Sequence, residues 1–188
     1  MNRHLKMFGL ALLMLSLITA AILGLVAGPT SPITWVLVAI LVAIPFLHKK
    51  LGDKRYIKWR DDYSVGIDSI DQQHKKLIGL INQLTTAVDY STGEEFERDA
   101  LAELVDYTKT HFTYEEGLLE DNQYPDFVAH RAQHRVMIAE VDAVLAEYEK
   151  DHDTAMRHAS DYLKEWLINH INGTDKLYSD YLIGKGVH

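Results

Sequence analysis

From Asp68 onward, apolar residues recur at helical spacing, and this periodicity restricts the possible fold more than any other feature of the chain. Four such segments run from Asp68 to Ser91, from Glu94 to Asp121, from Pro125 to Leu145, and from Thr154 to Leu182. No stretch among them alternates as a strand would. Short connections between four long helices predict an all-α fold, an antiparallel up-down-up-down four-helix bundle. Thr92 and Glu95 fit a capping box at the start of the second helix.

Five of the ten His residues fall on the predicted inner faces of these helices, together with two carboxylates. In chain order, these groups are His74, His111, Glu115, His130, His134, His170 and Asp175. Those on the first and third helices lie near the helix start, and those on the second and fourth lie near the helix end. Because these four positions share one end of an antiparallel bundle, the seven groups are expected to converge on one layer.

Burying five imidazoles and two carboxylates together is costly unless something binds them, so the layer predicts a metal centre. Seven ligands exceed the need of one tetrahedral zinc ion, which implies two ions. His and carboxylate ligands without sulfur suit iron, and the chain has no cysteine for a thiolate or iron–sulfur site. If both carboxylates bridge, the five His divide three and two. One additional bridging oxygen then leaves an open position on the second ion, where a small molecule can bind.

One spacing departs from helical geometry. His170 and Asp175 are five residues apart, which places them about 140° apart around an ideal α-helix. A local distortion at the intervening Gly173 is expected to bring the two side chains together.

The arrangement of His74, His111-x3-Glu115, His130-x3-His134 and His170-x4-Asp175 resembles the hemerythrins, and most closely their bacterial branch, the bacteriohemerythrins. The resemblance covers about Trp59 to Leu182 and fills all seven ligand positions. It implies two non-heme iron ions bridged by Glu115, Asp175 and an oxo or hydroxo group. His130, His134 and His170 would bind one iron, and His74 and His111 would bind the iron with the open position.

The resemblance further implies reversible dioxygen binding in an apolar pocket. The matching positions are Leu77, Phe112, Trp166, Leu167 and Ile171, although ordinary core packing explains each of them nearly as well. The ligand layer shows no surplus carboxylate and no Tyr–His pair that could act as a general acid. We therefore expect a dioxygen carrier or store rather than an enzyme. The alternatives are an oxygen or redox sensor that signals through a partner and, less favoured, a di-iron oxidase.

The N-terminal part of the chain is apolar and basic. Met7 to Ala27 is an uncharged run of 21 residues, and Ile33 to Leu47 is a second apolar run of 15 residues that contains Pro45. Gly28-Pro29-Thr30-Ser31-Pro32 lies between them as a turn signal. The two runs predict a transmembrane helical hairpin. The competing interpretation of the first run is a cleaved signal peptide, which is disfavoured because Leu25 or Val26 would occupy a cleavage position that requires a small residue.

The sign of the net charge also differs between the N-terminal part and the rest of the chain. Residues 1–60 carry a net charge of +7, and residues 61–188 carry −15. The acidic body argues against a nucleic-acid partner, and basic residues on both flanks of the hairpin predict that both ends are cytoplasmic. The expected domains are a transmembrane hairpin anchor over 1–50, a basic juxtamembrane linker over 51–60 and the hemerythrin-like domain over 61–188. The expected location is the cytoplasmic (inner) membrane, multi-pass, with lipid, dioxygen and a dioxygen-consuming membrane oxygenase or oxidase as partners.

Overall fold

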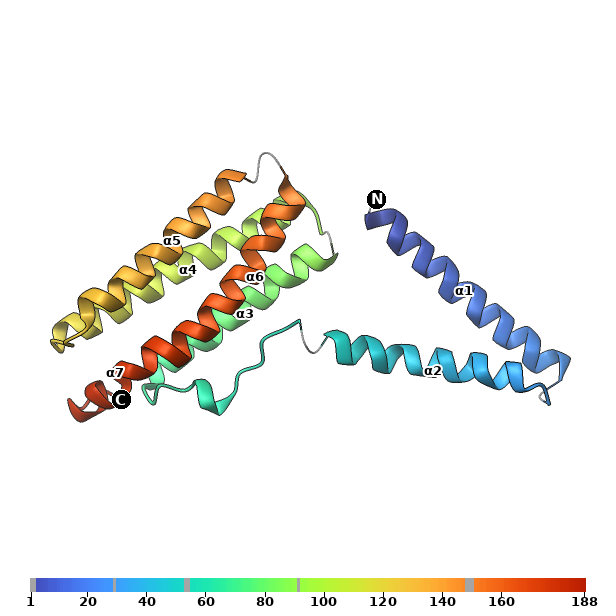
Figure 1. The fold of residues 1–188 in the computed structure, drawn as a ribbon, viewed down its shortest axis with the longest axis horizontal. Helices are drawn as coiled ribbons and strands as arrows, with labels where there is room; N and C mark the ends of the chain where they lie inside the picture. The colour runs from blue at the N-terminus through green and yellow to red at the C-terminus, as the bar shows by residue number, and fades with distance from the viewer. Residues whose placement is uncertain (1–2, 29, 53–54, 91, 148–150) are drawn as a thin grey trace. The chain divides into compact units, whose positions relative to one another are not determined.

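The computed structural model describes residues 3–28, 30–52, 55–90, 92–147 and 151–188, and within these ranges every regular element is helical (Figure 1). The chain divides into two compact units, Met1–Arg55 and Tyr56–His188. The structure thus assigns Tyr56 to Arg60, which the sequence places in a linker, to the second unit.

The first unit is a pair of helices, α1 (Arg3–Ala27) and α2 (Pro32–Gly52), that pack against each other. Ala21 and Thr34 are buried between them. Gly28 adopts a φ of 145° just after α1, a backbone conformation that favours glycine. Among the residues that the structure describes, no helix is both long enough and apolar enough to cross a membrane. The helical hairpin is therefore observed, whereas its predicted transmembrane character is not supported.

The second unit is the predicted antiparallel bundle. Its long helices are α3 (Asp68–Tyr90), α4 (Glu94–Asp121), α5 (Phe127–Glu147) and α6 (His152–His170), and a short 3-10 helix, η1 (Asp61–Tyr63), precedes them. Helix α3 packs on α4 and α6, and α5 packs on α4 and α6, which closes the ring of four. The predicted fourth helix is interrupted: α6 continues through a π-helical turn, η2 (Ile171–Asp175), into α7 (Lys176–Gly184).

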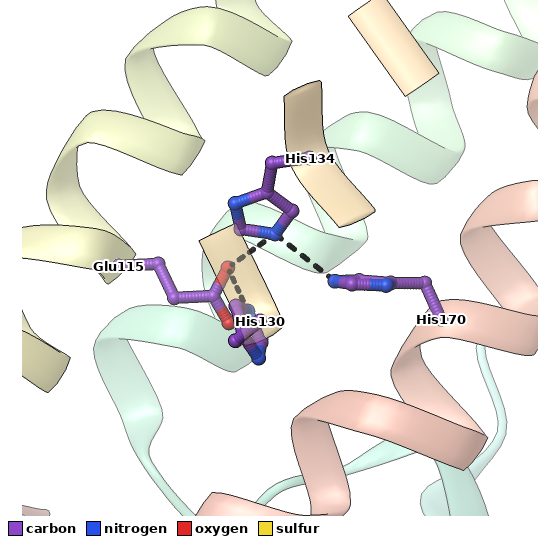
Figure 2. Close-up of side chains that lie close together, drawn as sticks. All are labelled: Glu115, His130, His134 and His170. Atoms are coloured by element: carbon purple, nitrogen blue, oxygen red, sulfur yellow. Dashed lines mark hydrogen bonds and ion pairs between the residues drawn. The ribbon is translucent and has the colours of Figure 1, made fainter. Parts of the chain in front are cut away.

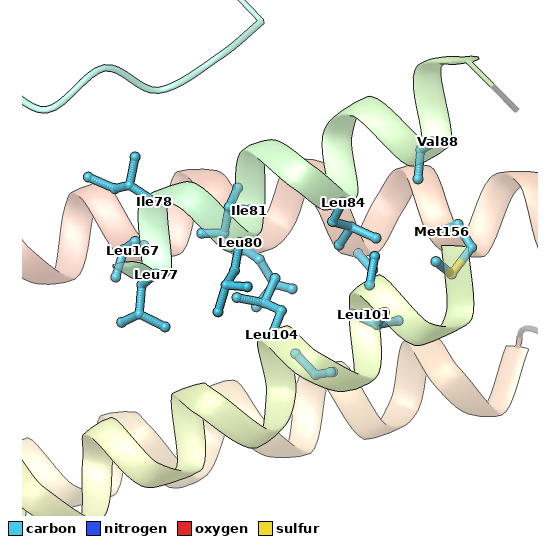
Figure 3. Packing of buried hydrophobic residues seen from close by; sticks show 14 of the residues in the cluster. Leu77, Ile78, Leu80, Ile81, Leu84, Val88, Leu101, Leu104, Met156 and Leu167 are labelled. Carbon is cyan, nitrogen blue, oxygen red and sulfur yellow. The ribbon is translucent and has the colours of Figure 1, made fainter. Parts of the chain in front are cut away.

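The bundle core is a cluster of mainly aliphatic side chains from α3, α4, α5 and α6, part of which Figure 3 shows. Leu84, Leu104 and Met156 are at most 1% exposed. Ile57, ahead of the bundle, joins this cluster, and its backbone N–H and C=O pair with the Asn82 side-chain amide on α3 at 2.9 and 2.8 Å. A second cluster, which includes Val65, Ile70, Leu119, Tyr178 and Leu182, fills the other end of the bundle.

The capping box predicted at Thr92 and Glu95 is wrong. Helix α4 begins after Gly93, whose φ of 118° and lack of a side chain leave the helix start without a side-chain cap. The Thr92 hydroxyl instead donates to the Ala87 carbonyl at 3.5 Å, at the end of α3. A glycine that allows an unusual backbone conformation thus replaces the expected side-chain cap.

Candidate metal centre

The structure brings all seven predicted ligands into one buried layer. His74 comes from α3, His111 and Glu115 from α4, His130 and His134 from α5, His170 from the end of α6, and Asp175 from the end of η2. Each residue is at most 4% exposed. Start-of-helix positions on α3 and α5 lie beside end-of-helix positions on α4 and α6, because neighbouring helices run antiparallel.

Figure 2 shows the Glu115 carboxylate facing His130 and His134. Its Oε2 atom is 3.4 Å from His134 Nε2 and 3.6 Å from both His130 Nε2 and His111 Nε2. His134 Nε2 and His170 Nε2 are 3.0 Å apart. Three imidazole nitrogens, one from α4 and two from α5, thus point at one carboxylate oxygen.

Asp175 occupies the corresponding place on the other side of the layer. Its Oδ1 atom is 3.1 Å from His170 Nε2, and its Oδ2 atom is 3.3 Å from His74 Nε2. The π-helical turn η2 provides this geometry, because its wider turn brings residues five apart onto one face. The distortion expected between His170 and Asp175 is therefore present.

The ligand atoms fall into two groups that share Glu115. One group contains His130, His134 and His170, and the other contains His74 and His111; within each group, including Glu115, the atoms lie within 4.8 Å of one another. Seven buried nitrogen and oxygen atoms of this layer have no hydrogen-bond partner, among them His74 Nε2, Glu115 Oε2, His130 Nε2 and both carboxylate oxygens of Asp175. Unpaired buried polar atoms are costly in an empty protein, and metal coordination would satisfy the five atoms named here. The donor set fits two metal ions.

The protonation states also suit a metal. Burial lowers the pKa of His111 to about 4 and that of His134 to about 3, so both imidazoles are neutral at pH 7 and can donate a lone pair. Burial alone would raise the pKa of Asp175. The His170 and His74 imidazoles beside its oxygens outweigh burial and hold that pKa well below its usual range. Asp175 is therefore an anion that can neutralise a bound cation.

Two side chains that the sequence analysis did not single out fix the outer nitrogens of the ligand imidazoles. Gln73 Oε1 lies 2.9 Å from His111 Nδ1, and Glu116 Oε1 lies 2.9 Å from His134 Nδ1. Such bonds set the tautomer of the ring, so that its other nitrogen faces the metal. Both residues directly neighbour a ligand in the sequence, which is the signal that could have identified them.

Tyr178 is a third residue that the sequence analysis missed. Its hydroxyl donates to Glu115 Oε1 at 2.5 Å, and its ring lies 5.6 Å from the ring of His130. The structure therefore places one further carboxylate, Glu116, and one tyrosine, Tyr178, beside the ligand layer. Burial, with the charges of Glu115 and Asp175, raises the pKa of Tyr178 well above its ordinary value. The phenol thus keeps its proton and holds Glu115 through its hydrogen bond.

A small apolar cavity of about 10 Å³ adjoins the layer. It begins one helical turn after His74 on α3 and one turn before His111 on α4. Its lining residues are Leu77, Ile81, Leu104, Thr108, Phe112, Met137, Leu163, Trp166 and Leu167. Four of the five predicted pocket residues line it, and the fifth, Ile171, is fully buried in the core without lining the cavity.

An antiparallel four-helix bundle with buried His and carboxylate ligands on all four helices defines a helical non-heme metalloprotein. The hemerythrin HHE cation binding domain family matches residues 65–182. A bacteriohemerythrin of Stenotrophomonas maltophilia is 38% identical over 122 residues, which cover 65% of this chain and 78% of that protein. One of Pseudomonas aeruginosa is 35% identical over 127 residues, covering 66% of this chain and 80% of that protein.

Solved structures give the same assignment. The crystal structure of wild-type hemerythrin superposes with a TM-score of 0.57 at 27% identity, covering 67% of this chain and 97% of that one. The chain therefore belongs to the hemerythrin family. A hemerythrin domain binds a di-iron centre, and the buried His/carboxylate cluster could hold those ions.

Proposed function

We propose that this protein binds dioxygen reversibly at a non-heme di-iron centre and serves as a carrier or store. The observation that carries the proposal is the asymmetry of the ligand layer, with three imidazoles in one group and two in the other, beside an apolar cavity. Six ligands around the three-His ion and five around the other would leave one position open. The relatives named above are bacteriohemerythrins, which supports the same function.

The protein's own contribution is to hold the ligands and to exclude water. When bound, the iron pair supplies the electrons for reversible dioxygen binding. Glu115 and Asp175 would bridge the ions and neutralise their charge, while Gln73, Glu116 and Tyr178 hold ligands in place. Leu77, Phe112 and Leu167 keep water and protons away from the open position.

Optical spectra of the iron-loaded protein test this function. We expect a colourless ferrous form that turns coloured in air and loses the colour again when dioxygen is removed. Irreversible bleaching with release of peroxide would instead indicate an oxidase. Metal analysis should find two irons per chain, and a single zinc would contradict the proposed centre.

We further propose that the N-terminal unit tethers the carrier to the cytoplasmic side of the inner membrane, near enzymes that consume dioxygen. Two features support the tether. The basic residues that flank the apolar runs favour a cytoplasmic body. Helices α1 and α2 also expose many large apolar side chains, including Phe8, Val26, Ile33 and Phe46, each more than 60% exposed. Extended apolar surfaces of this kind bind other apolar surfaces or lipid.

Fractionation and reporter fusions test the tether. The full chain should remain with membranes after a high-salt wash, and a C-terminal reporter should be active only in its cytoplasm-sensing form. Release from membranes by salt alone, or activity of a periplasm-sensing reporter, would contradict it.

A further inference from the structure

Two hollows of the bundle meet at one side chain, Phe112 of α4. The first is the apolar cavity beside the ligand layer. The second is a cleft of about 270 Å³ that opens to solvent between α4 and α5. Phe112 lines both, whereas the other residues of the cleft, such as Ile138 and Ala139 of α5, line only the cleft.

The Phe112 ring is held as a wall between the two hollows. It stacks on the imidazole of His134 with ring centres 3.6 Å apart and an angle of 4° between the planes. The centres of the Phe112 and Trp166 rings are 5.8 Å apart in an edge-to-face arrangement. Only 6% of Phe112 is exposed. The Phe112 ring thus lies between the solvent-open cleft and the cavity, and rotation of that ring would join the two.

The other residues that line the cavity do not line the cleft. Leu104, Met137 and Leu163 are at most 4% exposed and belong to the bundle core. Trp166 is partly exposed, but it stacks on His170 with ring centres 4.2 Å apart and does not line the cleft. Phe112 is therefore the one described side chain that lines both the cavity and the open cleft.

We propose that dioxygen reaches and leaves the di-iron site through the α4–α5 cleft, and that Phe112 is the gate that sets the exchange rate. This inference rests on the proposed function and adds a route to it. The closed ring keeps bulk water in the cleft, where the polar side chains of Glu116, Arg135 and Asp142 are available to it. A small apolar molecule needs only a brief displacement of the ring.

A gate has a kinetic signature that a binding residue lacks. Raising the barrier between two hollows slows association and dissociation by the same factor, so the dissociation constant does not change. A residue that contacts the bound ligand changes the dissociation constant instead. The two roles are therefore separated by measuring both rates.

The test places a larger side chain in the cleft, at a residue that lines the cleft but not the cavity. Ala139→Phe places a ring in the cleft, and Ala132→Phe, at an exposed position of α5 that lines neither hollow, is the matched control. In the iron-loaded full chain, we expect Ala139→Phe to slow dioxygen association and dissociation equally, by about threefold or more. The control should match the unsubstituted protein, and azide binding to the ferric protein should slow in parallel.

Three outcomes are decisive. If Ala139→Phe matches Ala132→Phe in every rate, the cleft is not the route. If only one of the two rates changes and the dissociation constant shifts, the cleft acts on the bound state and the gate is also rejected. If azide follows the expected pattern but the unsubstituted protein never binds dioxygen reversibly, the route stands and the proposed function fails.

Discussion

Glu115 is shared by both groups of metal ligands, and its Oε2 atom lies within 3.6 Å of three imidazole nitrogens. Replacing it with Ala would remove a bridge and leave two buried cations less neutralised. We expect Glu115→Ala to hold fewer than two irons per chain and to unfold at a lower temperature, because metal affinity and bundle stability are linked. Metal analysis and thermal unfolding measure both effects.

Glu120→Ala is the matched control for this substitution. Glu120 lies on the same helix and is exposed, so its loss removes one carboxylate without touching the ligand layer. Two irons per chain in Glu115→Ala would show that Asp175 and the imidazoles suffice, and would reject a bridging role for Glu115.

Tyr178 illustrates how a single hydroxyl can stabilise the layer. It is fully buried and donates to Glu115 Oε1. A hydrogen bond to a charged group contributes about 1.5–3 kcal/mol, so Tyr178→Phe should lower the free energy of unfolding by about that amount. Urea denaturation measures the change. Tyr114→Phe, at an exposed position of α4, should have almost no effect, and equal values for the two variants would contradict the assigned bond.

At the scale of the elements, the π-helical turn η2 is the feature on which the site most depends. It places Asp175 on the same face as His170, five residues earlier. Gly173 lies within this turn, but its φ is not positive, and a Cβ added there would meet no atom within 4 Å. The structure therefore gives no steric reason for glycine at this position.

Gly173→Ala should consequently be tolerated. We expect two irons per chain and a gain of about 0.5–1 kcal/mol in the free energy of unfolding, because Ala restricts the unfolded chain more than Gly does. Gly79→Ala in the regular helix α3 is the matched comparison, since a Cβ there also meets nothing. If only Gly173→Ala loses iron, the π turn requires glycine after all.

The helices and the ligand layer could be predicted from sequence. Apolar periodicity marks each helix, and the position of each ligand near a helix start or end shows which ligands meet in an antiparallel bundle. Other features could not. Gly93 starts α4 by a backbone conformation that residue identity does not determine, so the cap at Thr92 was predicted wrongly. Tyr178 and Glu116 lie beside ligands, yet their contacts depend on side-chain orientation across helices. The assignment of Ile57 to the bundle depends on its pairing with Asn82, which is 25 residues away.

At the scale of the whole molecule, all seven proposed metal ligands lie in the second unit, Tyr56–His188. We expect a truncated chain beginning at Arg55 to be soluble, helical and able to bind iron and dioxygen. A chain beginning at Gly66 loses buried Ile57 and Val65 and the partly buried Trp59 and Tyr63. It should be less stable by about 3 kcal/mol or more. Circular dichroism and urea denaturation of the two chains measure this difference.

The chain beginning at Arg55 also tests whether the second unit contains the complete dioxygen-binding site. If that chain folds and holds iron but does not bind dioxygen while the full chain does, the first unit takes part in the site. Equal stability of the two truncated chains would show instead that the segment from Ile57 to Val65 contributes little to the bundle.

The two groups of ligands also become available at different times during synthesis. His74, His111 and Glu115 are all supplied by α3 and α4, whereas the three-His group needs His170 from the end of α6. At typical translation rates, Asp175 leaves the ribosome roughly 5 to 20 seconds after His74. A nascent chain therefore displays two imidazoles and a carboxylate to the metal pool of the cell before it can enclose them. Correct loading with iron must wait for the last ligand or displace whatever ion bound first.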